Sequence, residues 1–217
     1  MKNFEAIIFD MDGLLLDSER IWLIAFQEAC LEFNLGDRTD LFNQCIGTNS
    51  EATKNILRNG LGDKVDYVKF WSLCRANYHA ETKIKPIPVK DGATDLLKHI
   101  KALQLPMAVA TSTHTEFAIT KLENAGLLEF FNKVIGGEQV SHSKPLPDIY
   151  LKATDSLQVM AKNCLALEDS ENGVKSALAA CLTVVQIPDL VEPSQTFRLN
   201  GHIILENLTE VINFKFN

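Results

Sequence analysis

The sequence lacks the features that mark zinc-thiolate, membrane and nucleic-acid-binding proteins. Its five cysteines are scattered and no two form a CxxC pair, which argues against a zinc site and fits buried thiols in a reducing compartment. No stretch approaches the roughly 18 apolar residues that a membrane helix needs. The opening MKNFEAIIFD reaches an acid before any long apolar run, which argues against a signal peptide. We therefore expect a cytoplasmic protein.

The sequence also contains no long cluster of acidic or of basic residues. The formal net charge is −7 and no run of like charge stands out, which argues against a nucleic-acid polymer or a membrane surface as the partner. A small anionic substrate stays compatible, because a local pocket can oppose the global sign. The length of 217 residues suits one domain, or one domain with an insertion. We expect a monomer and leave an oligomer open.

Short apolar runs alternate with helical patterns along most of the chain. The runs lack polar alternation, as expected of parallel strands that are covered on both faces, and they fall at residues 6–9, 107–110, 133–135, 164–167, 183–187 and 202–205. Helical patterns lie between them at residues 93–103, 116–125, 148–157 and 172–180. This alternation predicts an α/β fold with a doubly wound, Rossmann-like parallel sheet.

Residues 17–85 do not continue this alternation of strands and helices. They contain no convincing strand, and they predict helices at 19–33, shortly after Ser50, and at about 65–80. Ser18 and Ser50 are suitable helix N-caps, and Gly60 is a suitable stop. We therefore predict an all-helical cap domain at 17–85, inserted into a catalytic core made of residues 1–16 and 86–217.

Polar side chains gather where the predicted strands end. In an open parallel sheet, ligands bind outside the carboxyl ends of the strands, so polar sets at several strand ends converge on one crevice. Three such sets and a lysine before a helix are present: Asp10-Met11-Asp12-Gly13, Thr111-Ser112, Glu168-Asp169 and Lys144.

These residue types fit a phosphate group and a divalent cation. Carboxylates suit Mg²⁺, and we predict as its ligands the four acids Asp10, Asp12, Glu168 and Asp169. The ion would also relieve the repulsion between the acids. The hydroxyl of Thr111 and the ammonium of Lys144 suit a phosphate, as do backbone amides presented by a turn at Gly13. Of the first two acids, one can attack phosphorus while the other transfers protons.

Each segment also has a simpler interpretation when it is taken alone. An Asp-x-Asp pair at a strand end is commonly a solvated turn, and Thr111-Ser112 is compatible with a helix N-cap. Lys144 is compatible with a surface turn, and Glu168-Asp169 with an acidic helix start. The combination in this order favours a site, because matched polar sets at three strand ends rarely coincide.

Together the segments resemble the four motifs of the haloacid dehalogenase superfamily, in its phosphatase and β-phosphoglucomutase branch with a helical cap. The motifs stand here as FDMDG, VATST, SKPLPDIY and LEDSENGV. The resemblance implies that Asp10 is the nucleophile that forms an aspartyl-phosphate and that Asp12 is the general acid and base. It further implies a mobile cap, phosphate ligands Thr111, Lys144 and the Ser112 amide, and magnesium ligands Asp10, the Asp12 carbonyl, Asp169 and Glu168, the last directly or through water.

The resemblance implies a Mg²⁺-dependent phosphatase acting on a small phosphorylated metabolite, of the sugar-phosphate or nucleoside-monophosphate type. Cap positions near Gly47 and Thr48, and His114 after the second motif, are expected to line the leaving-group pocket. A phosphomutase is the first alternative, but Trp22 and Ser50 replace a histidine and an arginine of β-phosphoglucomutases, which favours the phosphatase. A phosphoacceptor or binding domain without turnover is the alternative from another class.

Overall fold

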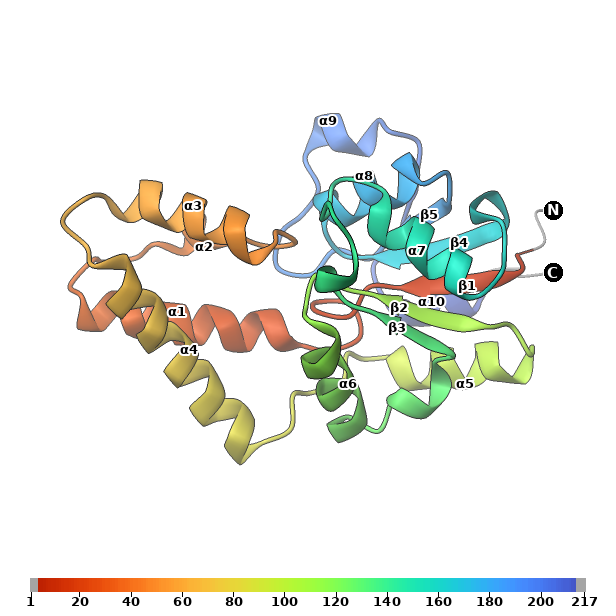
Figure 1. Cartoon of the computed structure of the whole chain (residues 1–217), viewed down its shortest axis with the longest axis horizontal. Coiled ribbons are helices and arrows are strands. Elements are labelled where there is room, and N and C mark those ends of the chain that lie inside the picture. The colour runs from red at the N-terminus through yellow and green to blue at the C-terminus, as the bar shows by residue number, and fades with distance from the viewer. Residues whose placement is uncertain (1–3, 214–217) are drawn as a thin grey trace.

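The six predicted strands form one parallel sheet (Figure 1). The computed structural model describes residues 4–213, and the strand order across the sheet is β3-β2-β1-β4-β5-β6. The strands are β1 (Ala6–Phe9), β2 (Met107–Ala110), β3 (Lys133–Ile135), β4 (Cys164–Glu168), β5 (Thr183–Gln186) and β6 (Ile203–Ile204). The predicted doubly wound α/β class is confirmed.

Helices cover both faces of the sheet. Ile7 and Phe9 of β1 pack on one face against α5, α6 and α10, whereas Ile8 packs on the other against α7 and α8. Burying each of these large side chains contributes about 1.5–3 kcal/mol, which explains the unbroken apolar strands. The core helices are α5 (Ala93–Ala102), α6 (Thr115–Asn124), α7 (Asp148–Ser156), α8 (Glu171–Ala179), α9 (Gln195–Arg198) and α10 (Leu208–Ile212), with short 3₁₀ turns η1 (Leu128–Phe130), η2 (Gly137–Gln139) and η3 (Ala161–Asn163).

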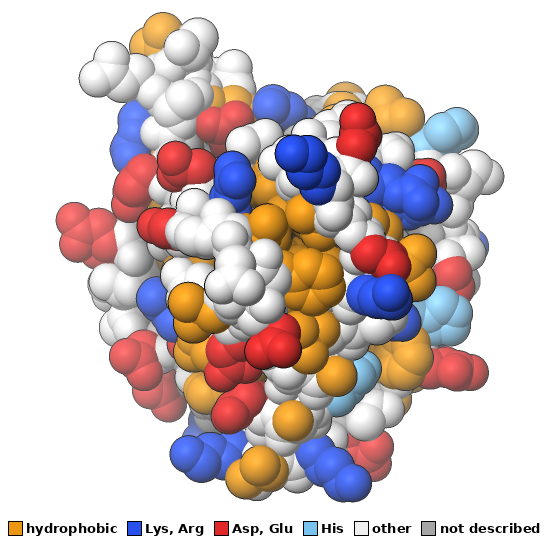
Figure 2. All heavy atoms as spheres, turned by 90° about the vertical axis from the view of Figure 1, so that its left-hand side faces the viewer, with side chains coloured by type: hydrophobic (Ala, Val, Ile, Leu, Met, Phe, Trp, Pro, Cys, Tyr) orange, Lys and Arg blue, Asp and Glu red, His pale blue; other side chains and the backbone are white. Residues whose placement is uncertain are grey.

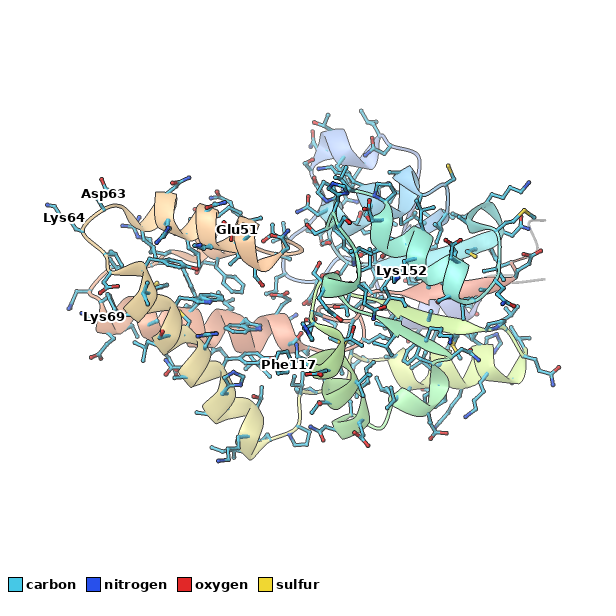
Figure 3. The ribbon with its side chains drawn as sticks, in the orientation of Figure 1. Glu51, Asp63, Lys64, Lys69, Phe117 and Lys152 are labelled. Carbon is cyan, nitrogen blue, oxygen red and sulfur yellow. The ribbon has the colours of Figure 1, made fainter. Side chains whose placement is uncertain are left out.

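Four helices separate β1 from α5 and project from the carboxyl ends of the strands (Figure 1). Their shared core is aromatic, with the Phe26 and Phe70 rings meeting edge to face at 5.5 Å. The loop tip at Asp63 and Lys64 lies farthest from the sheet (Figure 3). The helices are α1 (Ser18–Glu32), α2 (Thr39–Asn43), α3 (Ser50–Leu61) and α4 (Tyr67–Ile84).

The ends of these helices differ in detail from the sequence expectation. The N-cap of α1 is Asp17 and that of α3 is Asn49, so each helix starts one residue earlier than a serine cap requires. The Asn49 side chain accepts a hydrogen bond from the Ala52 amide at 2.7 Å, which explains the preference. Gly60 lies inside α3, and Gly62 at φ 78° ends it. The short helix α2 was not predicted.

Among residues 4–213, we find no helix long and apolar enough to cross a lipid bilayer.

Candidate active site

Three strand ends and one loop bring the predicted residues together. Asp10 follows β1, Thr111 follows β2, and Glu168 ends β4 with Asp169 behind it. Lys144 reaches the same place from the loop before α7. All five side chains are buried, although four of them carry ionisable groups. Burial of so many charges requires specific partners.

Lys144 supplies the central positive charge. Its ammonium lies 2.5 Å from Asp10 Oδ1 and 2.5 Å from Glu168 Oε1. Burial alone would lower the pKa of Lys144, but the two carboxylates outweigh it and raise that pKa above its ordinary value. We therefore expect Lys144 to be protonated beside Asp10 at neutral pH.

Glu168 is held by hydrogen bonds to both of its carboxylate oxygens. Oε1 accepts from the Tyr150 hydroxyl at 2.7 Å as well as from Lys144. Oε2 accepts from the backbone amides of Asp169 and Ser170 at 3.1 and 3.2 Å. The Tyr150 contact was missed in the sequence, where an aromatic residue in a helix predicts ordinary core packing.

Asp10, Glu168 and Asp169 form a group whose ligand atoms lie within 4.8 Å of one another. Burial, opposed by Lys144 and reinforced by Glu168, raises the pKa of Asp10 to about 7. Burial and the neighbouring Glu168 also raise the pKa of Asp169 well above its ordinary value. Three carboxylates thus share one ammonium, and their raised pKa values show that bringing them together as anions is unfavourable unless a further cation is bound.

Gly13 lets the first turn approach this group closely. At φ 86°, a Cβ on Gly13 would stand only 2.3 Å from Asp169 Oδ2. The Gly13 amide donates to the Leu16 carbonyl at 2.9 Å, so it is already paired inside the turn. Its clearest contribution here is the space that it leaves for Asp169, whereas the sequence expectation was a free amide for phosphate.

The Asp12 carboxylate lies in a separate set of contacts. Oδ1 accepts from Ser18 Oγ and from Lys121 Nζ, both at 2.7 Å. Oδ2 accepts from Thr113 Oγ1 at 2.7 Å and from Thr111 Oγ1 at 3.4 Å. Burial raises the pKa of Asp12, but Lys121 outweighs burial and the net pKa is lowered, so Asp12 is ionised. Its carboxylate is not part of the group that could hold a metal.

Sequence reasoning missed Lys121 and Thr113. Thr113 stands two residues after Thr111, and its amide donates to Thr111 Oγ1 at 3.1 Å. Lys121 lies in α6 next to the buried residues Ala118 and Leu122. A lysine on the buried side of an amphipathic helix needs a charged partner, and this was the signal in the sequence that could have indicated a site residue.

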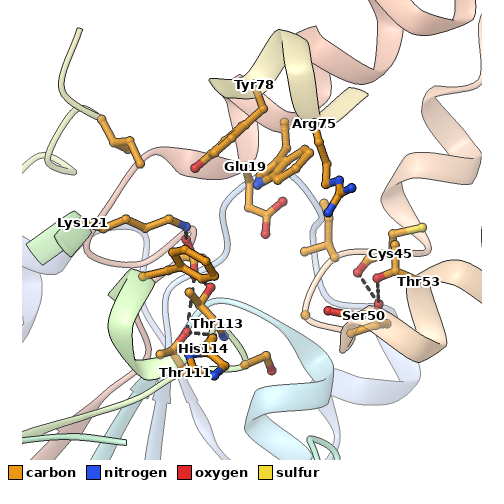
Figure 4. A pocket seen from close by; sticks show the side chains of 18 of the residues that line it. Glu19, Cys45, Ser50, Thr53, Arg75, Tyr78, Thr111, Thr113, His114 and Lys121 are labelled. Atoms are coloured by element: carbon orange, nitrogen blue, oxygen red, sulfur yellow. Dashed lines mark hydrogen bonds and ion pairs between the residues drawn. The ribbon is translucent and has the colours of Figure 1, made fainter. Parts of the chain in front are cut away.

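A cavity of about 670 Å³ opens from these residues toward α1, α3 and α4. Figure 2 views the molecule from the side of α1–α4, where hydrophobic side chains gather centrally with charged ones around them. Gly47 approaches the core so closely that a Cβ there would stand 2.5 Å from Ser170 Oγ. Thr48 donates to the Cys45 carbonyl at 2.7 Å. The predicted leaving-group residues Gly47, Thr48 and His114 line this cavity, as does the predicted phosphate ligand Ser112. Figure 4 shows His114 on the core side of the cavity.

Trp22 also lines the cavity, but its surroundings are aromatic. Its ring stacks on the rings of Trp71 and Tyr78, with centre-to-centre distances of 5.5 and 4.0 Å. Across the cavity, Phe117 of α6 is 64% exposed and lies on the side of α6 toward α1 (Figure 3). The wall of the cavity beyond the carboxylates is therefore largely aromatic, with a few polar groups among the rings.

The sequence model of the haloacid dehalogenase-like hydrolases matches residues 7–187, which include every motif residue described above. The chain belongs to this family. The phosphorylated carbohydrates phosphatase of Thermotoga maritima is 30% identical over 179 residues, covering 81% of each chain. The fructose-1-phosphate phosphatase YqaB of Escherichia coli is 27% identical over 191 residues, covering 86% of this chain and 97% of its own.

A solved structure of β-phosphoglucomutase from Clostridium difficile superposes with a TM-score of 0.77. It covers 96% of this chain and 93% of its own at 19% identity, which shows the shared fold alone. The predicted family, fold and assignment as a hydrolase of the phosphatase type are confirmed by these matches.

Proposed function

We propose that this hydrolase is a Mg²⁺-dependent phosphatase that cleaves a small phosphomonoester, of the sugar-phosphate or nucleoside-monophosphate type. The observation that carries the proposal is the buried group of Asp10, Glu168 and Asp169 around Lys144, with Asp12 two residues after Asp10 and paired with Lys121 at 2.7 Å. A nucleophile, a proton carrier, a phosphate-binding cation and a metal-binding group occupy one crevice. The phosphatase relatives support the same class of substrate.

In this proposal Asp10 attacks phosphorus and forms an aspartyl-phosphate, while Lys144 and Thr111 bind the phosphoryl oxygens. Asp12, once it has taken up a proton from water, gives that proton to the leaving oxygen and then accepts the proton of the attacking water, so each turnover restores the protonated acid. The four hydrogen bonds that Asp12 accepts fit the ionised form that the second step needs. Residues 17–85 act as a cap that excludes bulk water from the intermediate.

The donor set fits magnesium, a hard cation that takes oxygen ligands and keeps several waters. Asp10, Asp169 and the Asp12 carbonyl would hold it. Glu168 already accepts hydrogen bonds on both oxygens, so we expect it to act through a water and through Lys144. When bound, the ion supplies charge neutralisation for the phosphoryl group.

The proposal is tested with purified protein, Mg²⁺ and p-nitrophenyl phosphate. We expect turnover that stops in excess EDTA, and an Asp10→Asn variant without activity. Full rate in EDTA would reject the metal requirement, and a tenth of wild-type activity in Asp10→Asn would reject the nucleophile. A single stoichiometric labelling without turnover would indicate a phosphoacceptor domain instead.

A further inference from the structure

One face of α4 forms the cavity wall opposite the carboxylates. Trp71, Arg75, Tyr78 and Thr82 recur at helical spacing, and all four line the cavity. Figure 4 shows Arg75 and Tyr78 reaching into this space from the helix. Within residues 4–213, Arg75 has no hydrogen bond or ion pair, so this wall offers free polar groups among its rings.

Tyr78 is the most unusual member of this face. The residue is only 4% exposed, yet its buried O–H has no hydrogen-bond acceptor among the described residues; the neighbouring Lys121 ammonium can only donate toward its oxygen. An unpaired buried hydroxyl costs about 1–3 kcal/mol, so such groups usually have a reason to persist. The Tyr78 ring stacks on the Trp22 ring, with the two ring centres 4.0 Å apart and the ring planes 11° from parallel, and this packing fixes the direction of the Tyr78 ring.

The Tyr78 hydroxyl points into the cavity on the side of Lys121 (Figure 4). Lys121 Nζ lies 5.8 Å from the centre of the Tyr78 ring and 2.7 Å from Asp12 Oδ1. If Asp12 protonates the leaving oxygen, as the proposed function requires, the Tyr78 hydroxyl lies beside the first atoms of the leaving group. Burial raises the pKa of Tyr78, which keeps the phenol protonated and able to donate.

We infer that Tyr78 is a specificity-determining residue whose hydroxyl donates a hydrogen bond to a leaving-group hydroxyl next to the phosphoester. The preferred substrates are then phosphate esters of polyols and sugars rather than of plain alcohols. This inference rests on the proposed function and narrows its substrate class. It assigns Tyr78 to binding the leaving group, whereas Asp10 and Asp12 carry the chemistry.

The test compares glycerol 3-phosphate with n-propyl phosphate, which share a three-carbon leaving group and differ in two hydroxyls. We expect the wild-type enzyme to prefer glycerol 3-phosphate in kcat/KM. Tyr78→Phe keeps the ring stacked on Trp22 and removes only the hydroxyl. It should lower kcat/KM for glycerol 3-phosphate by about threefold to tenfold and leave n-propyl phosphate unchanged.

Tyr67→Phe is the matched control, because Tyr67 lies on the same helix away from the cavity and contacts Arg58 instead. It should change neither ester. An equal loss on both esters in Tyr78→Phe would indicate a structural role and overturn the inference, as would no loss on either.

If Tyr78→Phe does not fold, the wild-type comparison decides alone, since equal treatment of the two esters refutes the inference. Failure to hydrolyse both esters and p-nitrophenyl phosphate would refute the proposed function itself, and the inference with it.

Discussion

Replacing Lys144 by methionine is the sharpest test of the charge arrangement. The change keeps an unbranched side chain but removes the one ammonium that contacts both Asp10 and Glu168, each at 2.5 Å. The Lys144 side chain is only 3% exposed, so water cannot replace it. Removing one partner of a buried ion pair costs about 3–5 kcal/mol, because a buried charge is left uncompensated. We expect a loss of that size in the free energy of unfolding, measured without divalent metal.

The measurement is urea unfolding followed by circular dichroism in EDTA. Lys152→Met is the control, because this lysine lies exposed on α7 (Figure 3) and its removal should be nearly neutral. Added Mg²⁺ should restore part of the lost stability in Lys144→Met by neutralising the same carboxylates. A loss below about 1 kcal/mol, the range of surface ion pairs, would refute the buried-charge reasoning.

Two further predictions concern the same carboxylates. The folded-state pKa of Asp10 is about 7, above its ordinary 3.8, so the folded protein binds the extra proton and metal-free stability falls as pH rises between these values. Denaturant titrations should show this decline reduced in Asp10→Asn, and an unchanged slope would count against it. Gly13→Ala should abolish metal-dependent activity, because its Cβ would meet Asp169 at 2.3 Å. Gly36→Ala, at a similar positive φ with nothing within 4 Å, should stay active; equal losses would point to backbone strain instead.

The sheet could be predicted almost completely because its strands are buried on both faces. Ile7, Ile8 and Phe9 all avoid water, so the run is continuous and bounded by acids that cannot continue it. The short α2 was missed because a five-residue helix has too few turns for an apolar period to appear. Helix ends were displaced by one residue where Asp17 and Asn49, rather than the following serines, take the capping position.

The candidate site was predictable only where its residues follow strand ends. Asp10, Thr111 and Asp169 lie together because they follow neighbouring parallel strands, and the alternation of strand and helix patterns in the sequence predicts such a sheet. Lys121 reaches Asp12 across 109 positions from inside an ordinary helix, and no local pattern marks such a contact. Tyr78 is equally hidden, since an aromatic residue in a helix predicts core packing until the geometry shows its hydroxyl unpaired.

The carboxylates that would hold the metal also make the stability of the folded state sensitive to it, on the proposed function. Asp10 and Asp169 are buried with raised pKa values, so the metal-free protein pays in stability for keeping them together. A cation that binds only the folded chain adds RT ln(1 + [L]/Kd), about 2.7 kcal/mol at a hundredfold excess over Kd. In the metal-free protein, protons on Asp10 and Asp169 balance part of the negative charge that Lys144 does not, and a bound divalent ion would take their place. We therefore expect a divalent cation to stabilise the folded protein through the same carboxylates that, in the proposed function, present Asp10 to phosphorus.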